Sequence, residues 1–155
     1  MKQVTLCFLR REDQILLALK KRGFGAGNLN GVGGKLMSGE APEQAAVREA
    51  EEEIGVKIKI SNLEKVAELK FFFPHKPEWN LFCHVYITKK WTRVPVETEE
   101  MKPAWFPISQ LPFESMWADD PHWLPRVIRG EKIKGKFHFL SDNSVQKFSV
   151  RQAFF

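Results

Sequence analysis

The stretch GVGGKLMSGEAPEQAAVREAEEEIGV, residues 31–56, constrains this chain more than any other feature. A glycine-rich turn leads into a run crowded with glutamates, although the whole chain carries a net charge of +5. Residues 42–54 are predicted to form a helix, because Pro42 suits a first helical turn and Gly55 suits the residue after a helix end. Carboxylates crowded on one helix repel each other, so the pattern indicates that cations neutralise them.

The acidic helix offers a specific set of metal ligands. Glu49, Glu52 and Glu53 have the spacing i, i+3, i+4, so their carboxylates are predicted to converge on one helix face. Hard oxygen ligands at this spacing suit Mg²⁺ or Mn²⁺, which also bind phosphate groups. A solvated acidic face is the alternative interpretation of an isolated EAEEE run.

The remaining elements indicate an α+β fold with a mixed sheet. Residues 3–9, 14–20, 56–60, 64–73, 80–88 and 105–108 have strand patterns, and the first two predict a hairpin. The segments 132–140 and 145–151 predict a closing hairpin. Asp119 or Asp120 is expected to cap a second helix that runs to about Arg129. A chain of 155 residues indicates one domain, 1–155.

Composition and charge narrow the environment and the partners. Cys7 and Cys83 lie in apolar strand-like runs without a CxxC pair, which indicates buried free thiols and a cytoplasmic location. No segment approaches the ~20 apolar residues of a membrane span. A positive net charge favours anionic partners. The lysines are spread along the sequence, so we expect no dedicated nucleic-acid surface.

A longer motif begins at Gly34 and continues through the acidic helix. The sequence fits G-x5-E-x7-R-E-U-x-E-E-x-G-U, where U is a bulky apolar residue. The matching residues are Gly34, Glu40, Arg48, Glu49, Glu52, Glu53, Gly55 and Val56. This pattern resembles the signature of the Nudix hydrolase family. Ala50 departs from it, because a larger residue is usual at the first U position, and we expect this to alter packing and not chemistry.

The resemblance implies a loop–helix–loop on an α/β/α sandwich with a mixed central sheet. It also implies hydrolysis of a nucleoside diphosphate linked to another group, with Mg²⁺ as cofactor and Mn²⁺ as a possible substitute. By this resemblance the metal ligands are Glu49, Glu52, Glu53, Glu100 and the carbonyl of Gly34. Arg48 is expected to orient the glutamates and Glu40 to support the loop. Which glutamate acts as general base stays open.

Resemblance outside the motif suggests a substrate class. The segments LKKRGFGAGNLNGVGGK, PVETEEMKPAWF and PFESMWADDPHWLP are similar to the branch of MutT homologues that hydrolyses oxidised purine nucleoside triphosphates. This implies that Asn30, Asp119 and Asp120 read the purine edge and that Trp117 stacks on the base. The remaining substrate-binding residues that it implies are Thr5, Lys20, Phe24, Phe71, Phe73, Met101 and Trp123.

The adjacent aspartates have a distinctive chemistry. Burial and like charge both raise a carboxyl pKa, so either Asp119 or Asp120 is expected to keep its proton at neutral pH. A protonated Asp donates a hydrogen bond while its ionised neighbour accepts one, so the pair would suit several oxidised purines. The alternative is that the pair simply caps the second helix.

We therefore expect a monomeric enzyme that converts oxidised purine nucleoside triphosphates, such as 8-oxo-dGTP and 2-oxo-dATP, to the monophosphate and pyrophosphate. A second hypothesis keeps this chemistry but assigns another nucleotide substrate, such as a diadenosine polyphosphate, a nucleotide sugar or a capped RNA. A third is a nucleotide-binding module without catalysis. The intact set of Glu49, Glu52 and Glu53 argues against the third.

Overall fold

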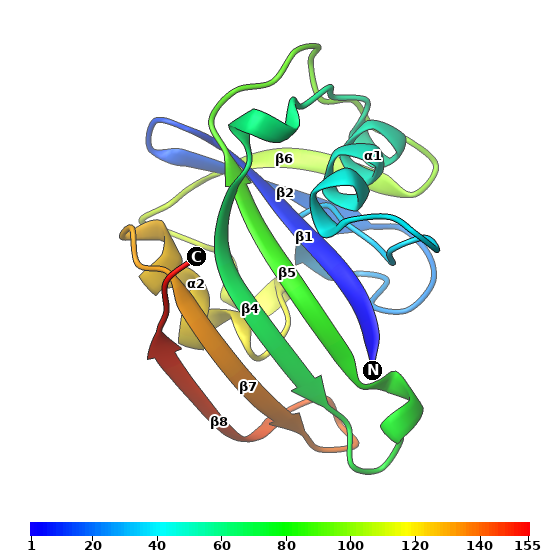
Figure 1. Ribbon diagram of the computed structural model, residues 1–155, viewed down its shortest axis with the longest axis vertical. Coiled ribbons are helices and arrows are strands. Elements are labelled where there is room, and N and C mark those ends of the chain that lie inside the picture. The colour runs from blue at the N-terminus through cyan, green and yellow to red at the C-terminus, as the bar shows by residue number, and fades with distance from the viewer.

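The computed structural model describes residues 1–155 as a mixed sheet with helices on both faces (Figure 1). The helices are α1 (Pro42–Ile54) and α2 (Asp120–Ile128). The strands are β1 (Lys2–Arg11), β2 (Gln14–Lys20), β3 (Leu29–Asn30), β4 (Glu64–Phe72), β5 (Leu81–Thr88), β6 (Met101–Pro107), β7 (Ile133–Phe139) and β8 (Val145–Gln152). Single-turn 3₁₀ helices lie at η1 (Ile60–Asn62), η2 (Pro77–Trp79) and η3 (Phe113–Ser115).

The sheet is incompletely paired between β1 and β2, where the candidate site forms. The order is β3-β2-β1-β5-β4-β7-β8, and β6 pairs with the other side of β2. β1 runs parallel to β5 and β4 runs parallel to β7, whereas the other pairs are antiparallel. β1 and β2 pair only beside their turn, through Arg10↔Ile15 and Arg11↔Gln14. Beyond that point the loop after β3 lies beside β1, through the bridges Cys7↔Val32 and Val4↔Lys35.

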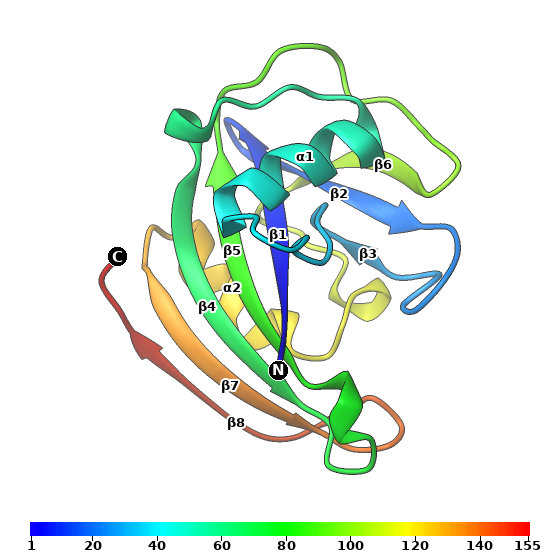
Figure 2. The ribbon, with the colours of Figure 1, turned by 45° about the vertical axis from the view of Figure 1, so that its right-hand side comes forward.

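The central strands carry apolar side chains on both faces, which explains the sandwich. On β1, Phe8 belongs to the cluster that includes Trp123 of α2. Its neighbours Cys7 and Leu9 point to the opposite face and belong to the cluster that includes Ala50 of α1. Side chains alternate along a strand, so each helix buries one face. Figure 2 shows α1 in front of the sheet and α2 behind it.

Most of the elements that the sequence predicted are present. The first helix spans the predicted residues, and Gly55 has the left-handed conformation expected after a helix end, with φ of 75°. The hairpin β1–β2, the closing hairpin β7–β8 and the second helix are also confirmed. β6 begins at Met101, which is earlier than the predicted strand 105–108. Its seven residues all pair with β2.

The predicted strand 56–60 is wrong. Val56 and Ile58 alternate with polar residues because they pack into the α1-side cluster, where both are buried. Lys57 forms only an isolated bridge with Thr92, and η1 begins at Ile60. An alternating pattern therefore reports burial on one side here and not a ladder of backbone hydrogen bonds.

Two smaller expectations concern the cysteines and the membrane. Cys7 and Cys83 are buried free thiols, as predicted. Neither α-helix has the length and apolar character that crossing a membrane would require.

Candidate active site

The loop before α1 is held between β1 and the helix by two glycines. The Gly33 N–H donates to Glu53 Oε1 at 2.7 Å, and the Gly34 carbonyl accepts from the Thr5 N–H at 2.9 Å. A Cβ on Gly33 would lie 1.8 Å from the Thr5 carbonyl oxygen, and one on Gly34 would lie 2.6 Å from Glu49 Oε1. Only glycine at both positions lets the loop pass this close to the strand and the helix.

Arg48 contacts three glutamates of the motif. Its guanidinium donates to both carboxylate oxygens of Glu40, at 2.8 and 2.9 Å, and to Glu49 Oε1 at 2.8 Å. A longer bond of 3.2 Å reaches Glu52. The hydrogen bonds from Arg48, followed by that from the Met37 N–H, lower the pKa of Glu40 to about 2. This geometry fits the expected roles of Arg48 as an orienting residue and Glu40 as a loop support, which stay predictions.

Glu53 and Glu49 behave differently from Glu40, because for these two the loss of solvation outweighs their hydrogen bonds. Burial raises the pKa of Glu53 to about 8, although the hydrogen bond from the Gly33 N–H opposes the shift. Burial also raises the pKa of Glu49, against the effect of Arg48. The charge of Glu100, in the segment before β6, raises the pKa of both. Carboxylates from two segments therefore share one electrostatic environment, which a divalent cation would stabilise.

The carboxylates share a helix face, but they do not converge as closely as the sequence predicted. Glu49 and Glu52 contact Arg48, and Glu53 contacts the Gly33 N–H. No group of three acidic, histidine or cysteine side chains is placed so that it could hold a metal ion together. The donors are nevertheless all oxygen atoms, and this set fits a hard divalent ion such as Mg²⁺.

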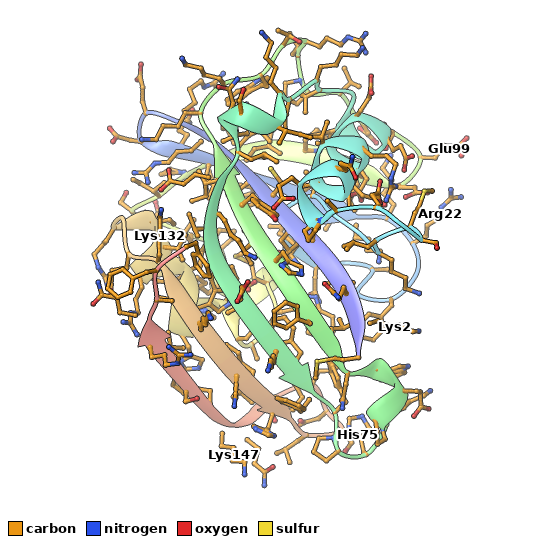
Figure 3. The ribbon with its side chains drawn as sticks, viewed as in Figure 1. Lys2, Arg22, His75, Glu99, Lys132 and Lys147 are labelled. Carbon is orange, nitrogen blue, oxygen red and sulfur yellow. The ribbon has the colours of Figure 1, made fainter.

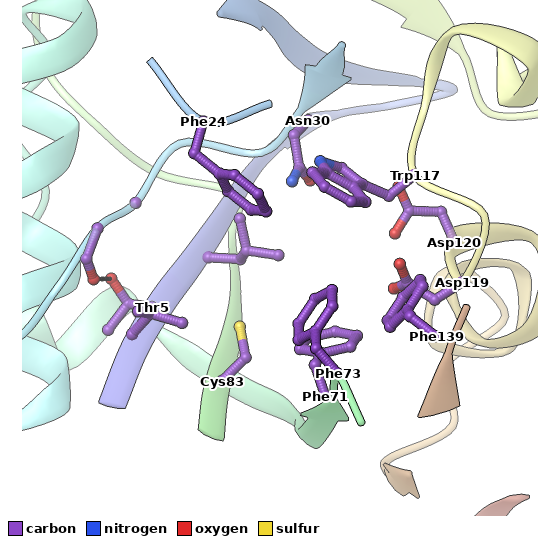
Figure 4. Close-up of a pocket in the computed structure, with 14 residues that line it drawn as sticks. Thr5, Phe24, Asn30, Phe71, Phe73, Cys83, Trp117, Asp119, Asp120 and Phe139 are labelled. Atoms are coloured by element: carbon purple, nitrogen blue, oxygen red, sulfur yellow. Dashed lines mark hydrogen bonds between the residues drawn. The ribbon is translucent and has the colours of Figure 1, made fainter. Parts of the chain in front are cut away.

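An aromatic cavity of about 150 Å³ lies on the α2 side of the sheet, next to this loop (Figure 4). The residues that line it are Val4, Thr5, Leu6, Phe24, Asn30, Gly33, Gly34, Phe71, Phe73, Cys83, Trp117, Asp119, Asp120 and Phe139. Because Gly33 and Gly34 belong both to its wall and to the loop that contacts Glu53 and Glu49, the cavity and the acidic helix form one continuous site.

Most of the predicted substrate-binding residues lie together at this cavity. Those that line it are Thr5, Phe24, Asn30, Phe71, Phe73, Trp117, Asp119 and Asp120. Lys20 and Met101 instead line an adjoining cavity of about 110 Å³, which shares Phe24, Asn30 and Trp117 with the first. Trp123 lines neither cavity. Its side chain is fully buried, and its indole N–H donates to Asp119, so its predicted part in substrate binding stays a prediction.

Five cavity residues were not predicted: Val4, Leu6, Gly33, Cys83 and Phe139. Phe139 stacks on Phe73 with ring centroids 5.0 Å apart and an interplanar angle of 10°. Phe71 and Phe73 are two positions apart in the sequence, as are Phe137 and Phe139, so the period-two spacing of a strand could have found this ring. No sequence signal distinguishes Cys83 from an ordinary core cysteine.

Aromatic rings form the mouth of the cavity as well as its floor. Phe24 lies on the exposed loop after β2, and its ring centroid is 5.3 Å from that of Trp117. On its other side Phe24 contacts Trp79 of η2, with centroids 5.2 Å apart. A flat planar ligand that enters here would contact Trp117 and the rings of Phe73 and Phe139.

Asp119 and Asp120 are both buried at the end of the cavity. Asp119 Oδ2 accepts a hydrogen bond of 2.8 Å from the indole of Trp123, whereas Asp120 Oδ2 has no partner. Burial, with the charge of its neighbour as the second cause, raises the pKa of Asp120 well above its usual range. Burial also raises the pKa of Asp119, against the hydrogen bond from Trp123. Asp119 precedes α2 but forms no side-chain cap, so capping does not account for the pair.

The opposite wall supplies a hydrogen-bond donor. Asn30 Oδ1 accepts from the Gly31 N–H at 2.8 Å, and this bond orients the side-chain amide. Its NH₂ group has no protein partner and faces the cavity that it shares with Asp119 and Asp120. The site therefore offers a donor from one side and a carboxyl pair from the other to the edge of one ligand.

Known proteins are similar to this chain in sequence and in fold. The family model described as NUDIX domain matches residues 1–127. An oxidized purine nucleoside triphosphate hydrolase of Mus musculus is 38% identical over 148 residues, which cover 96% of this chain and 93% of the mouse protein. A Danio rerio protein of the same name is 41% identical over 138 residues, 89% of this chain and 86% of its own. The crystal structure of a MutT protein from Bacillus halodurans superimposes with a TM-score of 0.81 at 22% identity, and covers 97% of both chains.

Proposed function

Because the chain belongs to the NUDIX family, we propose that it hydrolyses oxidised purine nucleoside triphosphates to the monophosphate and pyrophosphate in an Mg²⁺-dependent reaction. One observation carries the substrate class: an aromatic cavity ends in a buried aspartate pair, one oxygen of which has no partner in the protein. The two animal relatives, which are named for this activity, support the proposal independently.

The metal belongs at the acidic face of α1. Nudix hydrolases generally use divalent metal ions, and the oxygen donors of this chain suit Mg²⁺, with Mn²⁺ as a substitute. The proposed ligands are Glu49, Glu52, Glu53, Glu100 and the Gly34 carbonyl. When bound, the ion neutralises the polyphosphate and polarises the attacked phosphorus. Arg48 orients Glu49 and Glu52 through hydrogen bonds of 2.8 and 3.2 Å.

The base belongs in the aromatic cavity. Trp117 stacks on one face of the purine, where stacking on an aromatic ring is worth ~1–3 kcal/mol. Asn30 donates to the purine edge through the NH₂ group that faces the cavity. Of the aspartates, Asp120 has the carboxyl that burial most strongly keeps protonated, so it donates while Asp119 accepts. Oxidation of a purine changes which edge atoms donate and which accept, and this pair matches such a change by holding or releasing one proton.

The test is a substrate panel with a metal control. Release of pyrophosphate is measured from 8-oxo-dGTP, 2-oxo-dATP and dGTP, and release of AMP is measured from a diadenosine polyphosphate, each with Mg²⁺ and with EDTA. We expect the two oxidised nucleotides to have the highest kcat/KM and EDTA to abolish turnover. A preference for the diadenosine compound would assign the second substrate class. Nucleotide binding without release of either pyrophosphate or AMP under any metal condition would identify a binding module.

A further inference from the structure

One large face of the sheet lies open on the side opposite α2. The outward side chains of β4, β7 and β8 are not covered by a helix, whereas α1 covers the neighbouring end of β1 (Figure 1). On β4 these outward residues are Glu68, Lys70 and Phe72, which alternate with the buried Leu69 and Phe71. A solvent-exposed sheet face is ordinarily polar, so polarity alone does not indicate a binding site. The arrangement of charges and aromatic rings on this face is the informative feature.

Strand register brings basic residues from distant segments into one patch, here called the basic face: Lys70, Lys134, Lys136, Lys147 and Arg151. Lys70 pairs directly with Lys136 across β4 and β7, and Lys134 pairs with Arg151 across β7 and β8. Lys147 follows on β8 and is labelled at the lower edge of the patch in Figure 3. The expectation of no dedicated nucleic-acid surface did not foresee this patch, because 64 positions (134 − 70) separate Lys70 from Lys134 in the sequence.

Most of the charge on the basic face is not neutralised within the protein, and only Lys134 pairs with a carboxylate. Glu68 is the single carboxylate in the hollow of about 390 Å³ that the face contains, and it already bonds to Lys65 and Lys134. Lys70, Lys136, Lys147 and Arg151 form no salt bridge. Like charges directly opposite each other on neighbouring strands destabilise a sheet, as with Lys70 and Lys136. An external polyanion would remove this repulsion.

Aromatic rings stand among these cations. Phe82 lines the hollow, and Lys70 Nζ lies 5.8 Å from its ring centroid. Phe72 stacks on His138 across β4 and β7, with centroids 4.8 Å apart and an interplanar angle of 14°. Burial, and then the charges of Lys147 and Lys136, lower the pKa of His138, which keeps this stack neutral. Flat rings between ammonium groups offer stacking and charge on one surface.

We propose that the basic face binds single-stranded nucleic acid, with lysines on the phosphates and Phe72 and Phe82 against the bases. Sheet surfaces that combine exposed aromatic rings with cations recognise single strands in this way. An acidic peptide matches the charge but leaves the rings without planar partners. An anionic membrane requires apolar side chains that insert, whereas Phe72 and Phe82 are half-buried in the sheet surface.

This surface is separate from the candidate active site. Phe71 and Phe73 line the aromatic cavity on the α2 side, whereas Phe72 points to the opposite face. Lys70 and Lys136 contact neither the cavity nor the acidic helix. Binding at the basic face is therefore independent of the proposed hydrolysis, and removal of these two charges leaves catalysis unchanged.

The test uses fluorescence anisotropy with a labelled oligothymidylate of about 16 nucleotides and the full chain. The affinity is measured between about 50 and 200 mM salt for the unsubstituted protein and for Lys70→Gln/Lys136→Gln. The matched control is Lys57→Gln/Lys59→Gln, which removes the same charge from exposed positions near η1. Loss of two phosphate contacts reduces the slope of log K against log salt by about 1.4, and weakens binding roughly 20-fold at 0.1 M salt. We expect the control to change affinity by less than about twofold.

A second variant tests the rings. Phe82→Leu keeps the charge of the face and weakens oligothymidylate binding by about fivefold or more if a base stacks there. The hydrolysis rate with nucleotide substrates is measured for every variant and stays unchanged. Equal losses in the two lysine double variants would show only a general charge effect and would overturn the proposal. Polyglutamate or phosphatidylserine vesicles that bind the face as tightly as the oligonucleotide would also overturn it.

Discussion

The two groups of carboxylates at the site differ in how the protein treats their charge. Beside α1, Glu40 lies against the guanidinium of Arg48, which holds its pKa at about 2. At the start of α2, Asp119 and Asp120 are buried without a cation, and burial raises the pKa of both. Glu40 is therefore kept ionised, whereas the aspartate pair retains a proton.

This difference shows that a carboxyl group can serve two purposes, depending on its surroundings. A carboxylate that stays ionised is suited to hold a cation, and a carboxyl that stays protonated is suited to donate a hydrogen bond to a base. Glu53 stands between the two groups. It belongs to α1, yet burial raises its pKa to about 8. If Glu53 binds the metal as proposed, a cation would replace that proton and metal binding would release it.

The largest effect on activity should come from neutralising Glu53 in the acidic helix. We expect Glu53→Gln to lower kcat/KM more than about 100-fold, since even residues behind metal ligands contribute about 10–100-fold. The amide can still accept the hydrogen bond from Gly33, so the circular dichroism spectrum should not change. Glu51→Gln is the matched control, because Glu51 bonds to Arg93 and Lys57 outside the site. Comparable losses in both variants would mean that the helix, and not a ligand, had been disturbed.

The next effect concerns the cavity that the aspartate pair closes. Trp117→Ala should raise KM by about ten- to hundred-fold, because base stacking is worth ~1–3 kcal/mol. Stacking persists from the bound substrate to the transition state, so kcat should hold. Trp91→Ala is the control, since Trp91 stacks on Trp105 at a distance from the cavity. A loss confined to kcat would instead assign Trp117 a role in organising the acidic end.

A smaller and more selective effect should follow from fixing the proton on the aspartate pair. Asp119→Asn and Asp120→Asn each impose one arrangement of donor and acceptor. We expect the ratio of kcat/KM between 8-oxo-dGTP and 2-oxo-dATP to change by about tenfold, because an unpaired buried polar group costs ~1–3 kcal/mol. The Mg²⁺ dependence should not move, since neither residue is a proposed ligand. If each variant scaled both substrates and dGTP by one common factor, the pair would be structural and base recognition would be withdrawn.

The elements with clear end signals could be predicted from the sequence. Pro42 and Gly55 mark the ends of α1, and the observed helix begins and ends between them. Segment 56–60 lacked such information. Val56 and Ile58 alternate as in a strand, but hydrogen-bonded neighbours depend on where other segments pass, and only Thr92 reaches this one. Local pattern reports burial, whereas pairing is a property of the whole chain.

The site shows the same limit at the level of single residues. Motif spacing placed Glu49, Glu52 and Glu53 on one helix face. It could not show that Glu49 and Glu52 share the guanidinium of Arg48 while Glu53 accepts from the Gly33 N–H of the folded loop. The aspartate pair was predicted, yet Trp123 proved to be its support and not part of the cavity wall. Whether an aromatic ring lines a cavity or stands behind it depends on the path of the backbone, which no spacing encodes.

The smallest predicted effect, on thermal stability, should have opposite signs in the two carboxylate groups. The pKa of Asp120 is raised on folding, so its ionisation destabilises the protein as pH rises above the unfolded value. Asp120→Asn should therefore gain Tm relative to the unsubstituted protein between pH 4 and pH 8, by about 2–4 °C for each kcal/mol.

Glu40 is the opposite case. Its pKa is lowered to about 2, so it contributes stability above its ordinary value of 4.5, and that stability is lost as pH falls. Glu40→Gln should lose Tm at neutral pH, and the deficit should shrink as pH falls below about 4.5. Tm is measured by differential scanning calorimetry in EDTA, so that metal binding does not add to the difference. Parallel pH profiles for the two variants would show that both carboxyl groups occupy similar surroundings, and the comparison between the acidic helix and the aspartate pair would fail.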